Sequence, residues 1–138
     1  MNEDKQLIDS NVLVYAYDSS SGKHANAVRI LEDRLLNGTG VVSIQNLVEF
    51  CRIVTEKLPR KLTFEQARSI ILDLSESLDV VYYDNHAVAN ALSLCQIYGT
   101  HFFDALLIAT LEKENITTII TENEKDFKKV SWLNVIKF

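Results

Sequence analysis

Short apolar runs alternate along the chain with longer segments whose apolar positions recur every three or four residues. The short runs are typical of buried strands, and the longer periodic segments are typical of amphipathic helices. The predicted strands are Gln6–Ile8, Val41–Val42, Val80–Tyr83, Thr118–Ile120 and Leu133–Ile136, the last of them the weakest. Helices are expected over His24–Leu36, from Ser43 to before Pro59, from Thr63 to about Glu76, from Asp84 to Tyr98, and from Thr100 through Leu111, with a short helix or turn at Val12–Tyr17.

Residues at the ends of these helices support the boundaries. Asn37-Gly38 is a good C-terminal capping pair, since glycine adopts the left-handed conformation without strain. Ser43 is a candidate N-cap, and Thr63 with Gln66 three residues later fits a capping box. The elements therefore alternate between strand and helix from one end of the chain to the other.

This alternation predicts an α/β fold with a central parallel sheet of four to five short strands and helices on both faces. We expect right-handed crossovers between the strands. Neither an internal repeat nor a linker interrupts the pattern, so one domain should span residues 1–138. Folds of this class bind ligands beyond the carboxyl ends of their strands, which is where candidate chemistry should be sought.

Composition narrows the class of protein. With 138 residues the chain has the length of one domain, and its two cysteines are too few for a disulfide framework. The net charge is −5, with all of the deficit in residues 70–138, which excludes a general nucleic-acid coat. The acidic N-terminus is unlike a signal peptide, and the apolar stretch His86–Leu111 is too polar for a membrane span. We therefore expect a soluble, cytoplasmic protein.

Acidic side chains stand at several predicted strand ends and early helix turns. Asp9 follows the first strand, Glu49 lies in the helix after Ser43, and Asp104 is the only charge in a long apolar segment. Taken alone, Asp9 is better explained as a helix cap and Glu49 as a solvated acid, whereas Asp104 is equally explained as a first-turn acid or as a paired or metal-bound one. Together with the polar turn Thr121–Asp126 they can converge at one sheet edge, and hard oxygen ligands suit Mg²⁺ or Mn²⁺. The three histidines have no paired ligand spacing.

Four stretches of the chain resemble, in order, the motifs of the PIN-domain ribonucleases, in particular the small VapC-type toxins of toxin–antitoxin systems. Together they extend over nearly the whole chain from Leu7. The resemblance implies a single PIN-like domain. The matching stretches are Leu7–Leu13, Ser43–Phe50, Phe103–Ala109 and Thr121–Phe127.

By this resemblance, Asp9, Glu49 and Asp104 are the family's metal-binding acids. Thr121 matches its usual hydroxyl, and Asn11 matches a residue that helps to hold the acids. Two alternatives stay open after the last strand: either Asp126 completes the site, or the site uses three carboxylates and the amide of Asn123.

The implied activity is hydrolysis of RNA phosphodiester bonds with one or two Mg²⁺ or Mn²⁺ ions, leaving a 5′-phosphate and a 3′-hydroxyl. Local basic clusters could bind flanking phosphates, and Tyr15, Tyr17 and Phe64 could stack unpaired bases. The resemblance also implies a homodimer and a small antitoxin partner whose tail enters the acidic groove with an Arg. The segment Ile70–Glu112, which has no Lys or Arg, could suit such a partner or form the dimer face. The basic clusters are Lys57, Arg60 and Lys61, and Lys125, Lys128 and Lys129.

Three other interpretations compete with the toxin. A catalytically impaired PIN-like RNA- or protein-binding module is suggested by Asn123, where many family members have Asp. An aspartyl-phosphate enzyme with Asp9 as nucleophile is disfavoured because Asn11 stands where a second Asp is needed. An RNA-processing PIN enzyme would share the chemistry and differ in its substrate.

Overall fold

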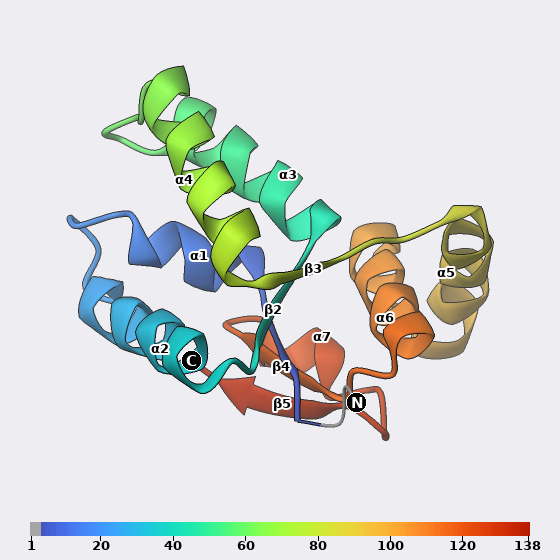
Figure 1. Ribbon diagram of the computed structural model, residues 1–138. Coiled ribbons are helices and arrows are strands. Elements are labelled where there is room, and N and C mark those ends of the chain that lie inside the picture. The colour runs from blue at the N-terminus through green and yellow to red at the C-terminus, as the bar shows by residue number, and fades with distance from the viewer. Residues whose placement is uncertain (1–3) are drawn as a thin grey trace.

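The computed structural model describes residues 4–138 and contains a five-stranded, all-parallel sheet in the order β3-β2-β1-β4-β5 (Figure 1). Strand β1 lies in the middle, with β2 and β3 on one side and β4 and β5 on the other. From β1 the chain adds β2 and β3 on one side, and then crosses to add β4 and β5 on the other side. The topological switch point therefore lies between β1 and β4. The strands are β1 (Gln6–Ile8), β2 (Gly40–Ser43), β3 (Asp79–Val81), β4 (Thr118–Thr121) and β5 (Asn134–Lys137).

Helices cover both faces of the sheet, as the alternating pattern predicts. Successive residues of a strand point to opposite faces, so Leu7 joins one buried cluster and Ile8 the other. The cluster of Leu7 contains α5 and α6, while that of Ile8 contains residues of α1 to α4. The helical elements are α1 (Ser10–Ala16), α2 (His24–Asn37), α3 (Ile44–Arg52), the π-helical turn η1 (Ile53–Lys57), α4 (Phe64–Ser77), α5 (Asn85–Tyr98), α6 (Phe102–Glu114) and α7 (Glu124–Phe127).

The predicted helix caps are confirmed. The Ser43 hydroxyl accepts a hydrogen bond from the backbone N of Asn46 at 3.0 Å, and Thr63 caps α4 in the same way with Gln66. Gly38 ends α2 with a φ of +68°, the left-handed conformation that favours glycine. These local signals fix where each helix meets its neighbouring strand.

Several predicted boundaries differ from the structure, and two of these differences have a clear physical reason. The strand expected over Val80–Tyr83 ends at Val81, because its partner β2 ends at Ser43 to cap α3. The helix expected from Thr100 begins at Phe102, since Thr100 is buried and His101 adopts the extended N-cap conformation. The turn expected after β4 contains the one-turn helix α7.

Helices α5 and α6 pack against each other (Figure 1). Together they have the length and composition of a membrane span, but a bend of 114° separates them. Within residues 4–138, no single helix is long and apolar enough to cross a membrane.

Gly40 is expected to tolerate no side chain. A Cβ atom at this first residue of β2 would lie 2.7 Å from Cδ2 of Leu78 and 3.1 Å from Cβ of Arg34. Gly40→Ala should therefore lower the free energy of unfolding by about 1–3 kcal/mol, the usual cost of overpacking. Urea denaturation measures this loss. Gly22→Ala is the matched control, because a Cβ there meets nothing within 4 Å; equal stability of the two variants would contradict the packing described here.

Candidate active site

The candidate site lies where the carboxyl ends of β1 and β4 meet, at the switch point of the sheet. Asp9 directly follows β1, and Thr121 is the last residue of β4. The backbone N of Asp9 donates to the carbonyl of Ile120 at 3.0 Å, which holds the two strand ends together. Helix α3 begins beside them, after Ser43 at the end of β2.

Asp9 is the centre of a hydrogen-bond network that orients its carboxylate. It is 7% exposed and acts as the N-cap of α1, accepting from the backbone N of Ser10 at 2.8 Å. Its Oδ2 accepts from the Thr121 hydroxyl at 2.7 Å and from Asn11 Nδ2 at 3.3 Å. Its Oδ1 accepts from Asn46 Nδ2 at 3.1 Å. Donors from three elements thus hold one buried acid in place.

Asn46 is a member of this network that the sequence interpretation missed. It is fully buried at the third position of α3, where its Oδ1 accepts from the Ser43 hydroxyl at 2.8 Å. Its amide nitrogen is thereby directed at Asp9. The signal was present in the sequence, since an amide three residues after a Ser N-cap forms a capping box, but the second contact depends on how α3 meets β1.

Ser10 connects two of the predicted acids. Its hydroxyl lies 3.5 Å from both Asp9 Oδ1 and Glu49 Oε2, at the limit of a hydrogen bond. Ser10 is buried, and Glu49 is half-buried. The first two predicted metal-binding acids therefore share one neighbouring hydroxyl.

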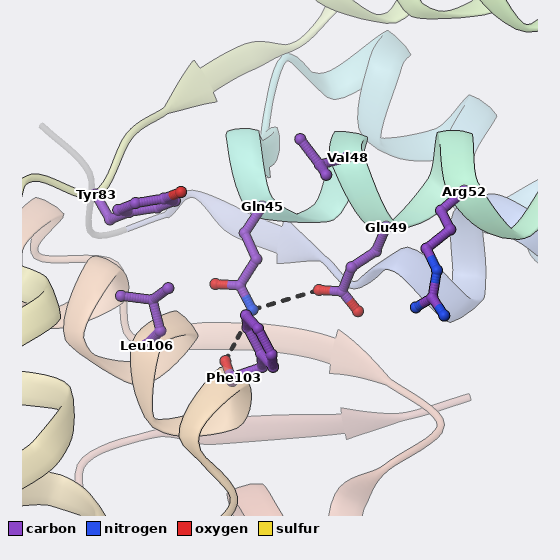
Figure 2. A pocket seen from close by; sticks show the side chains of 7 residues that line it. All are labelled: Gln45, Val48, Glu49, Arg52, Tyr83, Phe103 and Leu106. Atoms are coloured by element: carbon purple, nitrogen blue, oxygen red, sulfur yellow. Dashed lines mark hydrogen bonds between the residues drawn. The ribbon is translucent and has the colours of Figure 1, made fainter.

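Gln45 joins Glu49 to helix α6, which carries the third acid. Its Nε2 donates to Glu49 Oε1 at 3.3 Å and to the carbonyl of Phe103 at 2.8 Å (Figure 2). Asp104 follows Phe103 in the first turn of α6. Asp9, Glu49 and Asp104, which are far apart in the sequence, therefore come from three elements that meet at one edge of the sheet.

The pKa values of all three acids are raised, chiefly by burial. Burial raises the pKa of Asp9, against the opposing effect of its hydrogen bond from Thr121. Burial, followed by the charge of Asp9, raises the pKa of Glu49. Burial and the charges of Asp126 and Asp9 raise the pKa of Asp104. Across residues 4–138, none of these three acids forms an ion pair with Lys or Arg.

The donor set fits a hard divalent cation. Carboxylate oxygens are the ligands that Mg²⁺ and Mn²⁺ prefer, and a cation would offset both the burial of these acids and the repulsion that Glu49 and Asp104 feel from neighbouring carboxylates. In the described part of the chain, no three Asp, Glu, His or Cys side chains lie close enough to form a ready cage for an ion. The three acids therefore lie near enough to influence one another's pKa values without forming a closed set of ligands.

The segment after β4 brings three further predicted residues to this edge. The Thr121 hydroxyl donates to Asp9 and accepts from the backbone N of Asn123 at 3.0 Å, so the Asn123 contact is made by its main chain. Asn11 Oδ1 accepts from the backbone N of Glu122 at 3.2 Å, which ties α1 to this segment. Asp126 lies near enough to Asp104 to influence its pKa, and is 3.9 Å from Lys129.

Two of the predicted base-stacking aromatics are engaged within the fold. Tyr17 packs edge to face against the buried Phe50, and Tyr15 packs against Phe138 while its hydroxyl donates to Glu122. Phe64, at the start of α4, is exposed. Of the three side chains, only that of Phe64 is exposed and free to stack on a base.

Without divalent cations, the protein should become more stable as the pH falls from neutral toward 5. The folded chain holds the pKa values of Asp9, Glu49 and Asp104 above the ordinary 3.8–4.5, so it binds protons more tightly than the unfolded chain. Stability is then lost as pH rises through the raised values. Urea denaturation in EDTA at pH 5 and pH 7.5 measures the difference. An Asp9→Asn/Asp104→Asn variant should show a smaller dependence; an equal dependence would place its origin outside the acids.

Comparison with known proteins agrees with this architecture. A protein-family model described as PIN domain matches residues 7–133. A toxin–antitoxin complex from Klebsiella pneumoniae has a similar chain with 20% identity and a TM-score of 0.72, covering 96% of this chain and 97% of that chain. VapBC2 from Rickettsia felis, solved bound to a DNA fragment from its promoter, gives 21% identity, a TM-score of 0.69 and coverage of 96% and 98%.

A third similar structure is that of VapC20 from Mycobacterium tuberculosis, a toxin that cleaves the sarcin–ricin loop. It shares 14% identity and a TM-score of 0.68, covering 83% of this chain and 87% of that chain. At these identities the structures show a common fold. No curated protein matches the chain in sequence.

Proposed function

The chain belongs to the PIN-domain family, and on that premise we propose that it is a metal-dependent endoribonuclease, the toxin of a toxin–antitoxin pair. One observation carries the proposal. Asp9, Glu49 and Asp104 lie near one another beside the switch point of the sheet, with raised pKa values and without ion pairs to Lys or Arg in the described residues. An uncompensated carboxylate cluster at the ligand-binding edge of such a sheet is suited to a divalent cation.

Each side chain has a distinct part in the proposed reaction. Asp9 and Asp104 would be the primary metal ligands, and Glu49 would be a further ligand, directly or through water. Thr121, Asn11 and Asn46 hold the carboxylate of Asp9 in one orientation through their hydrogen bonds. When bound, Mg²⁺ or Mn²⁺ neutralises the phosphate, lowers the pKa of a coordinated water and stabilises the leaving oxygen of the phosphodiester.

Asp126 is the better candidate for the outer acid of the site. Its charge contributes to the raised pKa of Asp104, whereas the contact of Asn123 with Thr121 is made by the backbone. An amide at position 123 is then compatible with activity. Lys125, Lys128 and Lys129 lie in or directly after the same short helix, where they would contact phosphates flanking the cleaved bond.

The proposed setting is a cytoplasmic homodimer inhibited by a small antitoxin. Similar structures were solved as toxin–antitoxin complexes, which supports this setting for a chain of the same fold. The acidic cluster would attract an Arg on the antitoxin tail, because its carboxylates are not neutralised by ion pairs with basic side chains of the described chain.

Metal removal tests the proposed activity. The purified protein is incubated with a labelled, structured RNA in Mn²⁺ or Mg²⁺, and in parallel with EDTA. We expect cleavage with either ion, none in EDTA, and recovery when the ion is added back in excess. Cleavage that persists in EDTA would contradict the mechanism. Absence of cleavage on a broad RNA panel, combined with absence of Mn²⁺ binding, would favour a catalytically impaired PIN-like binding module.

A further inference from the structure

A groove of about 330 Å³ lies beside the acidic cluster, between α3 and α6 (Figure 2). Its walls are the side chains of Val48, Tyr83, Phe103 and Leu106. Tyr83 is 40% exposed and Phe103 is 66% exposed, although both are large aromatic residues. Glu49 belongs to both the groove and the cluster, so a ligand in the groove would lie next to the proposed metal site.

Gln45 places one unsatisfied hydrogen-bond acceptor in this groove. The side chain is 7% exposed, and its Nε2 is committed to Glu49 and to the Phe103 carbonyl. Both of these partners are acceptors, which fixes the amide with its oxygen on the opposite side. Figure 2 shows Oε1 directed toward Tyr83 and Leu106, and this buried atom has no hydrogen-bond partner. A buried acceptor without a partner is costly, so the groove favours an occupant that supplies an N–H donor.

The shape and chemistry of the groove favour a flat ligand over an aliphatic one. Tyr83 and Phe103 offer aromatic faces on which an unpaired base can stack. An aliphatic side chain from a protein partner would leave Gln45 Oε1 buried without a donor. Arg52 stands at the rim beside Glu49, where its guanidinium can reach a phosphate, since its pairing with Glu56 is long at 3.8 Å.

We infer that this groove binds one unpaired nucleobase of the RNA, next to the cleaved bond, and selects a base with an amino group such as adenine or cytosine. The amino group donates to Gln45 Oε1. Uracil presents carbonyl oxygens that flank its single N–H, and the nearby Nε2 of Gln45 is already in use. The inference rests on the proposed function, because it takes RNA as the ligand.

Nucleotide binding tests this inference without any need for catalysis. The full chain, labelled with ¹⁵N, is titrated in EDTA with AMP, CMP, UMP and purine riboside 5′-monophosphate, which is AMP without its amino group. We expect the side-chain amide signals of Gln45 to shift with AMP and CMP. Each matched partner, purine riboside 5′-monophosphate or UMP, should bind about tenfold more weakly because Oε1 then stays unpaired.

Two kinds of variant separate stacking from hydrogen bonding. Phe103→Leu should weaken binding of all four nucleotides by about fivefold or more and keep the preference for AMP and CMP. Gln45→Met should remove the preference. Equal binding within each matched pair by the unchanged protein would overturn the selection of an amino group. Absence of shifts with all four nucleotides would overturn the base site and leave the groove to a protein side chain, and neither result depends on RNA cleavage.

Discussion

Replacing Asp9 with Asn should reduce kcat/KM for metal-dependent RNA cleavage by about a thousandfold or more, since a metal ion contributes several kcal/mol of transition-state stabilisation. Asp9 is the most central of the three acids, with hydrogen-bond donors from α1, α3 and β4 directed at its carboxylate. The Asn side chain has a similar shape but no negative charge with which to bind the ion. Initial rates with a labelled RNA in Mn²⁺ measure the loss.

The fold should survive this substitution. An Asn side chain can keep its oxygen toward Ser10 and Asn46 and turn its nitrogen toward the Thr121 hydroxyl, which can accept a hydrogen bond; only the 3.3 Å contact from Asn11 Nδ2 is lost. Because burial raises the pKa of Asp9, removing its charge should leave the melting temperature in EDTA unchanged or raise it. Asp73→Asn, on the exposed side of α4, is the control and should keep full activity. An Asp9→Asn protein that cleaves as fast as the control would contradict the assignment.

Replacing Asn46 with Asp should lower the free energy of unfolding by about 3 kcal/mol at pH 7.5 without metal, the cost of an uncompensated buried charge. The new carboxylate would keep the contacts with Ser43 but would stand where Nδ2 now lies, 3.1 Å from Asp9 Oδ1. The repulsion raises the pKa of the pair, so the lost stability should return as the pH falls toward 5.

Urea denaturation of Asn46→Asp at two pH values, beside Asn46→Ala, measures this effect. The Ala variant loses the hydrogen bond to Asp9 and those from Ser43 without adding charge, so its loss of stability should depend less on pH. Added Mn²⁺ should recover part of the stability of Asn46→Asp, because an ion that binds the folded state stabilises it. If the stability of the two variants depended equally on pH, the contact between Asn46 and Asp9 would not have the role described.

Much of the fold could be predicted because its signals are local. Period-two placement of Leu7 and Ile8 on opposite sheet faces, the cap at Ser43 and the left-handed Gly38 all act within a few residues. Tyr82 and Tyr83 looked like strand residues by propensity, yet they lie beyond β3. The length of β3 is set by where β2 ends, which is information from another part of the chain.

The same distinction holds for the site. Asp9 and the residues after β4 could be placed at strand ends from the pattern alone, and the structure brings them within hydrogen-bond reach of one another. The contact of Asn46 with Asp9 and the free acceptor of Gln45 depend on the packing of α3 against β1 and α6. Such contacts join residues with no short-range relation in the sequence, so no periodicity or spacing reveals them.

Calorimetric titration of Mn²⁺ into the purified protein tests the central claim, that Asp9, Glu49 and Asp104 together hold a divalent cation. The unchanged protein should bind Mn²⁺ saturably, and Glu49→Gln and Asp104→Asn should each bind it more weakly, with Asp73→Asn unaffected. Absence of binding by the unchanged protein, or equal binding by all four proteins, would contradict the claim.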